Sequence, residues 1–139
     1  MKISVVDGSN YFKGLLLLLR KDGRISQAEI DVMKRIGETL GFERGFCDNA
    51  IGEILENTHI VDTPPVFSTK ELAIKFVKDG LVLAFCDNDF HPLEEQWLRS
   101  TAEINGLEVD WFARERDSVV NKKGPTDRLE ADDLRLMYT

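Results

Sequence analysis

Hydrophobic residues recur every three to four positions along most of the chain, which is the spacing of amphipathic helices. The pattern predicts helices over 9–20, 26–40, 43–56, 69–86, 91–105 and 108–120. The first helix of each set of three ends in an apolar run, Leu15 to Leu19 and Leu81 to Cys86. A helix that is apolar on every side is a buried helix, so we expect these two ends to lie together at the centre of the fold.

The two sets of helices are related by an offset of 65 residues, at which the turn Asp22 to Glu29 aligns with Asp87 to Glu94. The match continues downstream, where Gly41 falls on Gly106, and both glycines are placed to end helices in the left-handed conformation. Internal self-similarity of this kind usually means that one supersecondary unit is used twice. The sequence therefore predicts an all-α fold, a single domain over 1–139 with repeat one at about 9–57 and repeat two at about 69–122.

Helix starts and connections are also marked in the sequence. Ser26 with Glu29, and Ser68 with Glu71, have the spacing of a capping box, in which a hydroxyl and a carboxylate each accept a backbone N–H. Residues 57–67 are too short and mixed for a domain linker, so we expect a loop held on the surface. The tail, 123–139, is charged but carries several leucines, which favour a short docked helix over the alternative of a disordered end.

Composition narrows the class of protein. A chain of 139 residues with 42% hydrophobic residues can form one core without disulfide bonds or a structural metal. The net charge of −7 argues against nucleic acid and against a basic contact with anionic lipid. No apolar run approaches the ~20 residues of a membrane span, the start is too short for a secretory signal, and the two cysteines form no CxxC. We expect a cytoplasmic protein that does not insert into a membrane.

The repeated acidic turn is the candidate for chemistry. Asp22-Gly23 followed by Glu29 has the spacing of the second half of an EF-hand calcium loop, but Leu18 and Arg20 occupy the first and third ligand positions. Neither turn alone supplies the roughly six to eight oxygens that Ca²⁺ takes. If the two turns converge about a pseudo-two-fold axis, they form one shared site for Ca²⁺, Mg²⁺ or Mn²⁺. Its candidate ligands are Asp22, Glu29, Asp87, Asp89 and Glu94.

The same residues have a structural interpretation, which we favour. Glu29 is explained by capping, and Asp22 and Asp87 by turn formation. His91 lies beside the second turn as a further candidate ligand, although a histidine in front of a helix-starting proline is more often a cap. The cysteines and histidines lack the paired spacing of zinc ligands, and no nucleophile or Gly-rich phosphate loop stands in a recognisable motif. We expect no enzyme.

The doubled turn resembles the TerB-like family, named for tellurite resistance protein B. The resembling stretches are Leu15 to Glu29 and Ala84 to Glu94, each an apolar helix, an acidic turn and a glutamate seven residues after the first aspartate. The likeness spans about 9–120 and extends to the corresponding domain of membrane-anchored DjlA-type co-chaperones. Asn88 departs from it, since the family has glycine there.

The resemblance implies a bacterial all-helical domain of about seven helices, with an acidic face proposed to bind metal. It implies a role in stress or tellurite resistance, within protein complexes near the membrane. Carried over by position, the metal candidates are Asp22, Glu29, Asp87 and Glu94; Lys21 and Arg24 beside the first turn weaken that interpretation. Our leading hypothesis is a non-enzymatic, metal-responsive or protein-interaction module. The alternative is a structural adaptor that binds a protein partner without metal.

Overall fold

The computed structural model describes residues 1–22, 25–57, 59, 61–85, 91–121 and 129–137. Its α-helices are α1 (Val5–Leu19), α2 (Gln27–Leu40), α3 (Arg44–Glu56), α4 (Lys70–Phe85), α5 (Pro92–Ile104) and α6 (Val109–Asn121). Two 3-10 helices, η1 (Arg20–Asp22) and η2 (Glu130–Asp133), and two short strands, β1 (Lys2–Ile3) and β2 (Arg135–Leu136), complete it. The all-α class is confirmed. The described residues hold six α-helices where about seven were expected.

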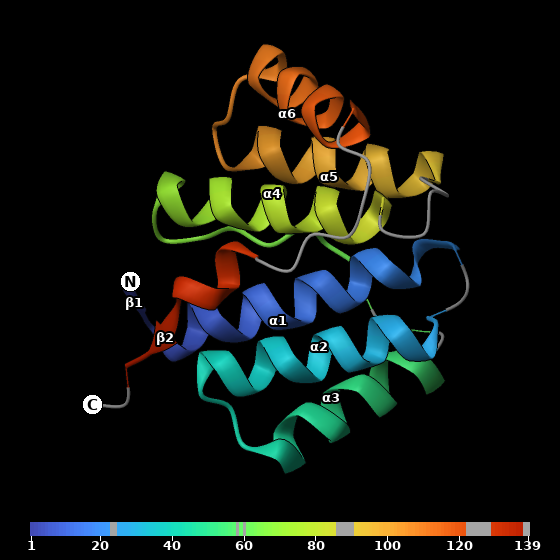
Figure 1. Cartoon of the computed structure of the whole chain (residues 1–139), viewed down its shortest axis with the longest axis vertical. Helices are drawn as coiled ribbons and strands as arrows, with labels where there is room; N and C mark the ends of the chain where they lie inside the picture. Colours follow the sequence, from blue (N-terminus) through green and yellow to red (C-terminus); the bar gives the residue numbers. More distant parts are fainter. Residues whose placement is uncertain (23–24, 58, 60, 86–90, 122–128, 138–139) are drawn as a thin grey trace.

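The helices fall into two groups, α1 to α3 and α4 to α6, with α1 and α4 in contact between them (Figure 1). The apolar helix ends lie where the sequence predicts, since Leu15, Leu16, Leu18, Leu19, Leu81 and Leu83 are all buried. Cys86 lies outside the described residues. Leu17, Val82 and Phe85 of the same runs are only partly buried, so each helix is covered on most of its sides there.

Helix bounds follow the offset seen in the sequence. Helices α1, α2 and α3 begin at residues 5, 27 and 44, and α4, α5 and α6 begin at 70, 92 and 109, each 65 residues later. Gly41 has a φ of 107° and Gly106 a φ of 76°, so both predicted left-handed stops are confirmed. In each group the residue after the glycine donates its N–H back to a carbonyl of the last turn, as in a Schellman motif.

The predicted capping box at Ser68 is wrong by one residue. Helix α4 is capped by Thr69, whose Oγ1 accepts the Leu72 N–H at 3.2 Å. Ser68 instead donates its hydroxyl and its N–H to the carboxylate of Asp7, at 2.5 and 3.1 Å. The buried carboxylate of Asp7 is a charged acceptor, and a hydrogen bond to a charged group is stronger than a neutral cap.

The connection between the two groups is held on the surface, as expected. Asn105 donates to the Pro65 carbonyl and accepts the Phe67 N–H, both at 2.9 Å. The Trp97 indole donates to the Asp62 carbonyl at 2.7 Å. Trp97 of α5 and Asn105, which follows its last residue, therefore hold the described part of this loop against the second group.

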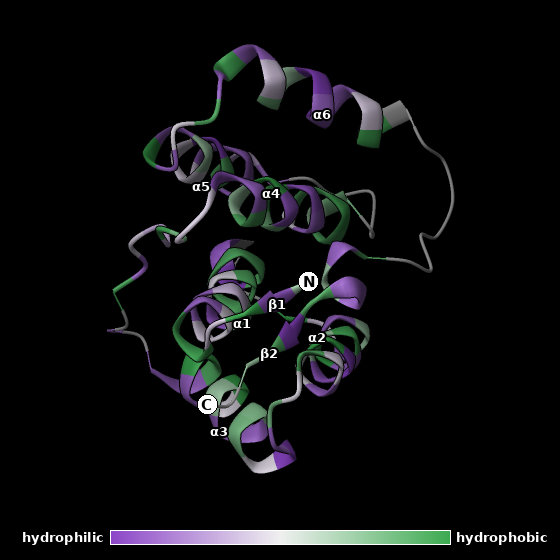
Figure 2. Cartoon of the chain, turned by 90° about the vertical axis from the view of Figure 1, so that its left-hand side faces the viewer, coloured by the Kyte–Doolittle hydropathy of each residue, from purple (hydrophilic) through white to green (hydrophobic). Residues whose placement is uncertain are grey.

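The tail docks on the body over residues 129–137, here named the strap, while 123–128, 138 and 139 lie outside the described residues. Leu129, Ala131 and Leu134 of the strap are buried in the common core. Strands β1 and β2 pair in parallel, with Lys2 opposite Arg135 and Ile3 opposite Leu136, between α1 and α2 (Figure 2). Docking is thus confirmed for the strap. The strand pair was not anticipated, because two residues carry too little periodicity to predict a strand.

Gly37 marks the closest approach of α2 to α3 and yields a stability prediction. A Cβ placed there would lie 2.3 Å from the buried Cys47 Sγ. We expect Gly37→Ala to lower the free energy of unfolding by about 1–3 kcal/mol, because this overpacking outweighs the ~1 kcal/mol by which alanine exceeds glycine in a helix. Urea unfolding of both single variants and Gly37→Ala/Cys47→Ala measures the coupling. The double variant should recover much of the loss; strictly additive effects would contradict the contact.

Candidate functional site

The two glutamates of the acidic turns are buried at helix starts. Glu29 accepts the Ser26 N–H at 2.9 Å while the Ser26 hydroxyl accepts the Glu29 N–H at 3.1 Å, which completes the predicted capping box. Glu29 is 8% exposed and Glu94 3% exposed. Glu94 accepts the His91 N–H at 3.2 Å, at the corresponding place in α5. Both carboxylates thus satisfy backbone donors that a helix start leaves without partners.

His91 is the N-cap of α5. Its Nδ1 accepts the Leu93 N–H at 3.1 Å, and Pro92 follows at the first helical position. The capping interpretation of His91 is confirmed.

The remaining candidates for the shared metal site lie outside the described residues: Asp87, Asp89 and the side chain of Asp22. Within the described ranges, no three His, Cys, Asp or Glu residues lie close enough together to hold one metal ion. The shared site therefore stays a prediction.

A basic residue is fixed beside the first turn. Lys21 forms an ion pair with Asp62, and its ammonium lies 6.0 Å from the centre of the Trp97 ring. The hydrogen bond from Lys21 lowers the pKa of Asp62 below its ordinary value. A positive charge next to Asp22 works against binding of a divalent cation at this end of the molecule.

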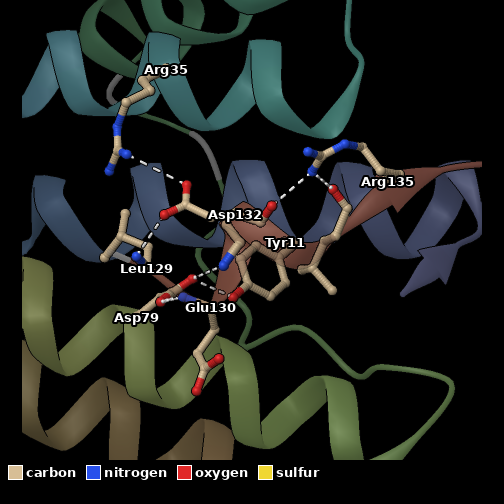
Figure 3. A network of polar contacts seen from close by, with 9 residues as sticks. Tyr11, Arg35, Asp79, Leu129, Glu130, Asp132 and Arg135 are labelled. Atoms are coloured by element: carbon tan, nitrogen blue, oxygen red, sulfur yellow. Dashed lines mark hydrogen bonds and ion pairs between the residues drawn. The ribbon is translucent and has the colours of Figure 1, made fainter. Parts of the chain in front are cut away.

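The densest polar cluster lies elsewhere, around Asp79 in the middle of α4 (Figure 3). The Asp79 carboxylate is 1% exposed. It accepts the Tyr11 hydroxyl at 2.5 Å, the Glu130 N–H at 2.6 Å and the Ala131 N–H at 2.9 Å. One buried carboxylate therefore joins α1 and α4 to the first turn of η2 in the strap.

Charges of opposite sign surround this contact. Lys75 and Lys78 of α4 lie 3.6 and 3.9 Å from the Glu130 carboxylate, and Arg35 of α2 lies 3.4 Å from that of Asp132. The acids of the strap thus face a rim of cations on the body. These pairs are partly exposed, so they orient the strap more than they stabilise it.

Burial perturbs both titratable groups at the centre of the cluster. It raises the pKa of Asp79 from its ordinary 3.8 to about 6, against hydrogen bonds from Tyr11 and the strap that favour the charged form. Burial and the neighbouring Asp79 raise the pKa of Tyr11 well above its ordinary value. The low polarity of the site, rather than a neighbouring charge, is the main cause in both cases.

The sequence holds a signal for this cluster that our predictions did not use. Asp79 falls on the buried face of α4, in line with Leu72, Phe76 and Leu83, where an apolar residue is the rule. A charged residue at core spacing requires a buried partner. The identity of that partner is not readable from the pattern, because the strap follows Asp79 by some 50 residues.

Small hollows open on the described surface, and two of them have a defined lining. One, of about 240 Å³, is lined by Lys34, Glu38, Arg44, Cys47 and Asp48. The other, of about 230 Å³, lies between α1 and α3 and is lined by Lys13, Leu17, Ala50, Glu53, Ile54 and Val61. Neither is lined by a residue of the acidic turns or by Asp79. They are smaller than the usual small-molecule site, so neither carries a ligand proposal.

Comparison of the chain with protein-family models, curated proteins and solved structures finds no match. The TerB-like resemblance therefore stays a prediction from the residues themselves. In the part of the chain that the structure describes, no helix has both the length and the apolar character needed to cross a bilayer.

Proposed function

We propose that the chain is a non-enzymatic, TerB-like protein-interaction module whose acidic turns begin helices rather than hold a metal ion. The observation that carries this proposal is the use of Glu29 and Glu94 as buried helix caps in both groups. The matching offset of the helix starts supports two three-helix repeats. From the resemblance we further propose a bacterial cytoplasmic setting, a role in tellurite or stress resistance, and a protein partner in a membrane-associated complex.

The second candidate is the metal-responsive form of the same module. It would use Ca²⁺, Mg²⁺ or Mn²⁺ and the shared set of Asp22, Glu29, Asp87, Asp89 and Glu94, with His91 beside them. The equal spacing of acids in both turns favours it. Two observations weigh against it: both glutamates already accept backbone hydrogen bonds, and Lys21 stands fixed beside the first turn.

Thermal stability in the presence of metal separates the two candidates. A ligand at 100 times its dissociation constant adds about 2.7 kcal/mol, which raises the unfolding temperature by several degrees in a domain of this size. For the wild type we expect no shift with Ca²⁺, Mg²⁺ or Mn²⁺. A metal-dependent rise that is lost in Asp22→Asn/Asp87→Asn, but kept in the matched surface variant Glu53→Gln/Glu103→Gln, would overturn the proposal in favour of the metal-responsive module.

A further inference from the structure

The strap lies between helices that also contact α1 directly. Helix α1 contacts both α2 and α4 directly, and η2 lies against α2 and α4. Three strap side chains, Leu129, Ala131 and Leu134, insert between these helices and are 4% exposed or less. The strap thus packs on the helices as a bound peptide would, with Leu129, Ala131 and Leu134 buried and its acids at the rim.

The first repeat has a segment at the corresponding place. Pro65 and Gly14 lie 65 residues before Glu130 and Asp79, and a Cβ on Gly14 would lie 3.2 Å from the Pro65 ring. In both repeats, therefore, a segment after the third helix crosses the same point of the first helix. The chemistry of the two contacts differs, since Pro65 has no N–H and meets a glycine, whereas the Glu130 N–H meets a carboxylate at 2.6 Å.

The second contact has a polar floor, whereas the first is apolar. When the strap is in place, Asp79 and the Tyr11 hydroxyl are both withdrawn from water. Removing a carboxylate from water opposes binding, and its release restores the lost hydration. The raised pKa of Asp79 reflects the same desolvation. An apolar surface under the strap would gain no favourable hydration when the strap leaves. A carboxylate in that position therefore suits a binding site whose occupant exchanges.

We propose that the place of the strap between α2 and α4, here called the groove, is a docking site for a short acidic peptide segment, and that the strap is its resident, displaceable occupant. The inference rests on the proposed function, because it names the partner class of the interaction module. The segment carries two leucines that enclose three acidic residues and one small residue, as in Leu129 to Leu134. Its leading N–H groups bond to Asp79, its leucines enter the core, and its acids meet Lys75, Lys78 and Arg35.

Native-state hydrogen exchange on the full wild-type chain tests whether the strap opens by itself. The reporters are the hydrogen-bonded amides of Glu130, Ala131, Arg135 and Met137. We expect them to exchange at least about 100-fold faster than core amides of α1 and α4, through an opening that denaturant hardly accelerates. Equal protection of strap and core would overturn the proposal, because the strap would then leave only when the whole domain unfolds.

Peptide binding tests the groove itself. The full-length variant Leu129→Ala/Leu134→Ala has a weakened strap, and a labelled peptide of residues 129–139 is the probe. We expect this variant to bind the peptide at least about tenfold more tightly than the wild type does, and Asp79→Asn in the same background to remove that gain. Leu55→Ala/Val120→Ala, which alters two exposed apolar residues, should bind no better than the wild type.

Two results of the binding experiment would overturn the inference. One is a folded strap-weakened variant that fails to bind the peptide. The other is a strap-weakened variant without helical circular dichroism, since the strap would then be an inseparable part of the core. Neither result bears on the metal titration, so the proposed function stands or falls separately.

Discussion

Asp79→Ala is expected to lower the free energy of unfolding by about 3–5 kcal/mol, because it removes the acceptor of three hydrogen bonds at once. The Tyr11 hydroxyl and the N–H groups of Glu130 and Ala131 would be left without a partner in a site closed to water. Each such buried donor costs about 1–3 kcal/mol. The three donors together would cost about 3–9 kcal/mol, and relief from burying the Asp79 charge offsets part of this cost, which leaves a net loss of about 3–5 kcal/mol.

Urea unfolding of two graded variants checks this result. Tyr11→Phe removes one donor and leaves Asp79 with both strap N–H bonds, so we expect a loss of about 1–2 kcal/mol. Asp79→Asn keeps one acceptor oxygen but places an amide donor opposite the remaining N–H groups, so its loss should be intermediate. A loss below about 1 kcal/mol for Asp79→Ala would show that water satisfies these donors, contrary to the burial of the site.

The regular part of this fold was predictable because it depends on local signals. Apolar spacing located the helices, Gly41 and Gly106 ended two of them, and Ser26 with Glu29 began one, since each signal acts within a turn or two of the chain. The error at Ser68 has a different origin. Its hydroxyl had two acceptable uses, and the choice was made by Asp7, which lies 61 residues away.

The polar cluster around Asp79 was less predictable, because its hydrogen-bond partners also lie far away in the sequence. Asp79 was visible as a charge at a core position, but its partners come from α1 and from the strap. The strand pair likewise joins the two ends of the described chain, with only two residues on each side. Polar contacts between residues that are far apart in the chain produce no periodic pattern in the sequence. The acidic turns show the converse, since a doubled motif that suggested metal ligands contains two glutamates engaged in capping.

The free energy of unfolding should fall as pH rises from about 4 to about 7, with about 2.4 kcal/mol of the change due to Asp79. Its pKa is about 6 in the folded chain and returns to the ordinary 3.8 on unfolding. Between these values the native state holds a proton that the unfolded state has released. The stabilisation is therefore complete below pH 3.8 and is lost as pH passes through 6.

Comparison with Asp79→Asn isolates this contribution from that of other carboxyl groups. Glu130 is the charged group that acts on Asp79, and it is itself paired with Lys75 and Lys78 of α4, while Asp132 pairs with Arg35 of α2. Tyr11 stays neutral throughout, since its own pKa is raised. The difference in unfolding free energy between wild type and Asp79→Asn should change by about 2.4 kcal/mol from pH 4 to 7. Glu103→Gln, an exposed control, should leave the pH dependence of the wild type intact; a difference independent of pH would contradict the prediction.

Protonation of Asp79 should also change the local opening of the strap, which needs less free energy than unfolding of the whole domain. Linkage is reciprocal, so a strap that raises the pKa of Asp79 by burying it is itself held more tightly when Asp79 is protonated. With hydrogen-exchange rates corrected for their intrinsic pH dependence, the opening free energy at the Glu130 and Ala131 amides should decline across the same window. If only global unfolding responded to pH, the strap and the carboxylate would not be coupled locally, and the groove would have no opening of its own.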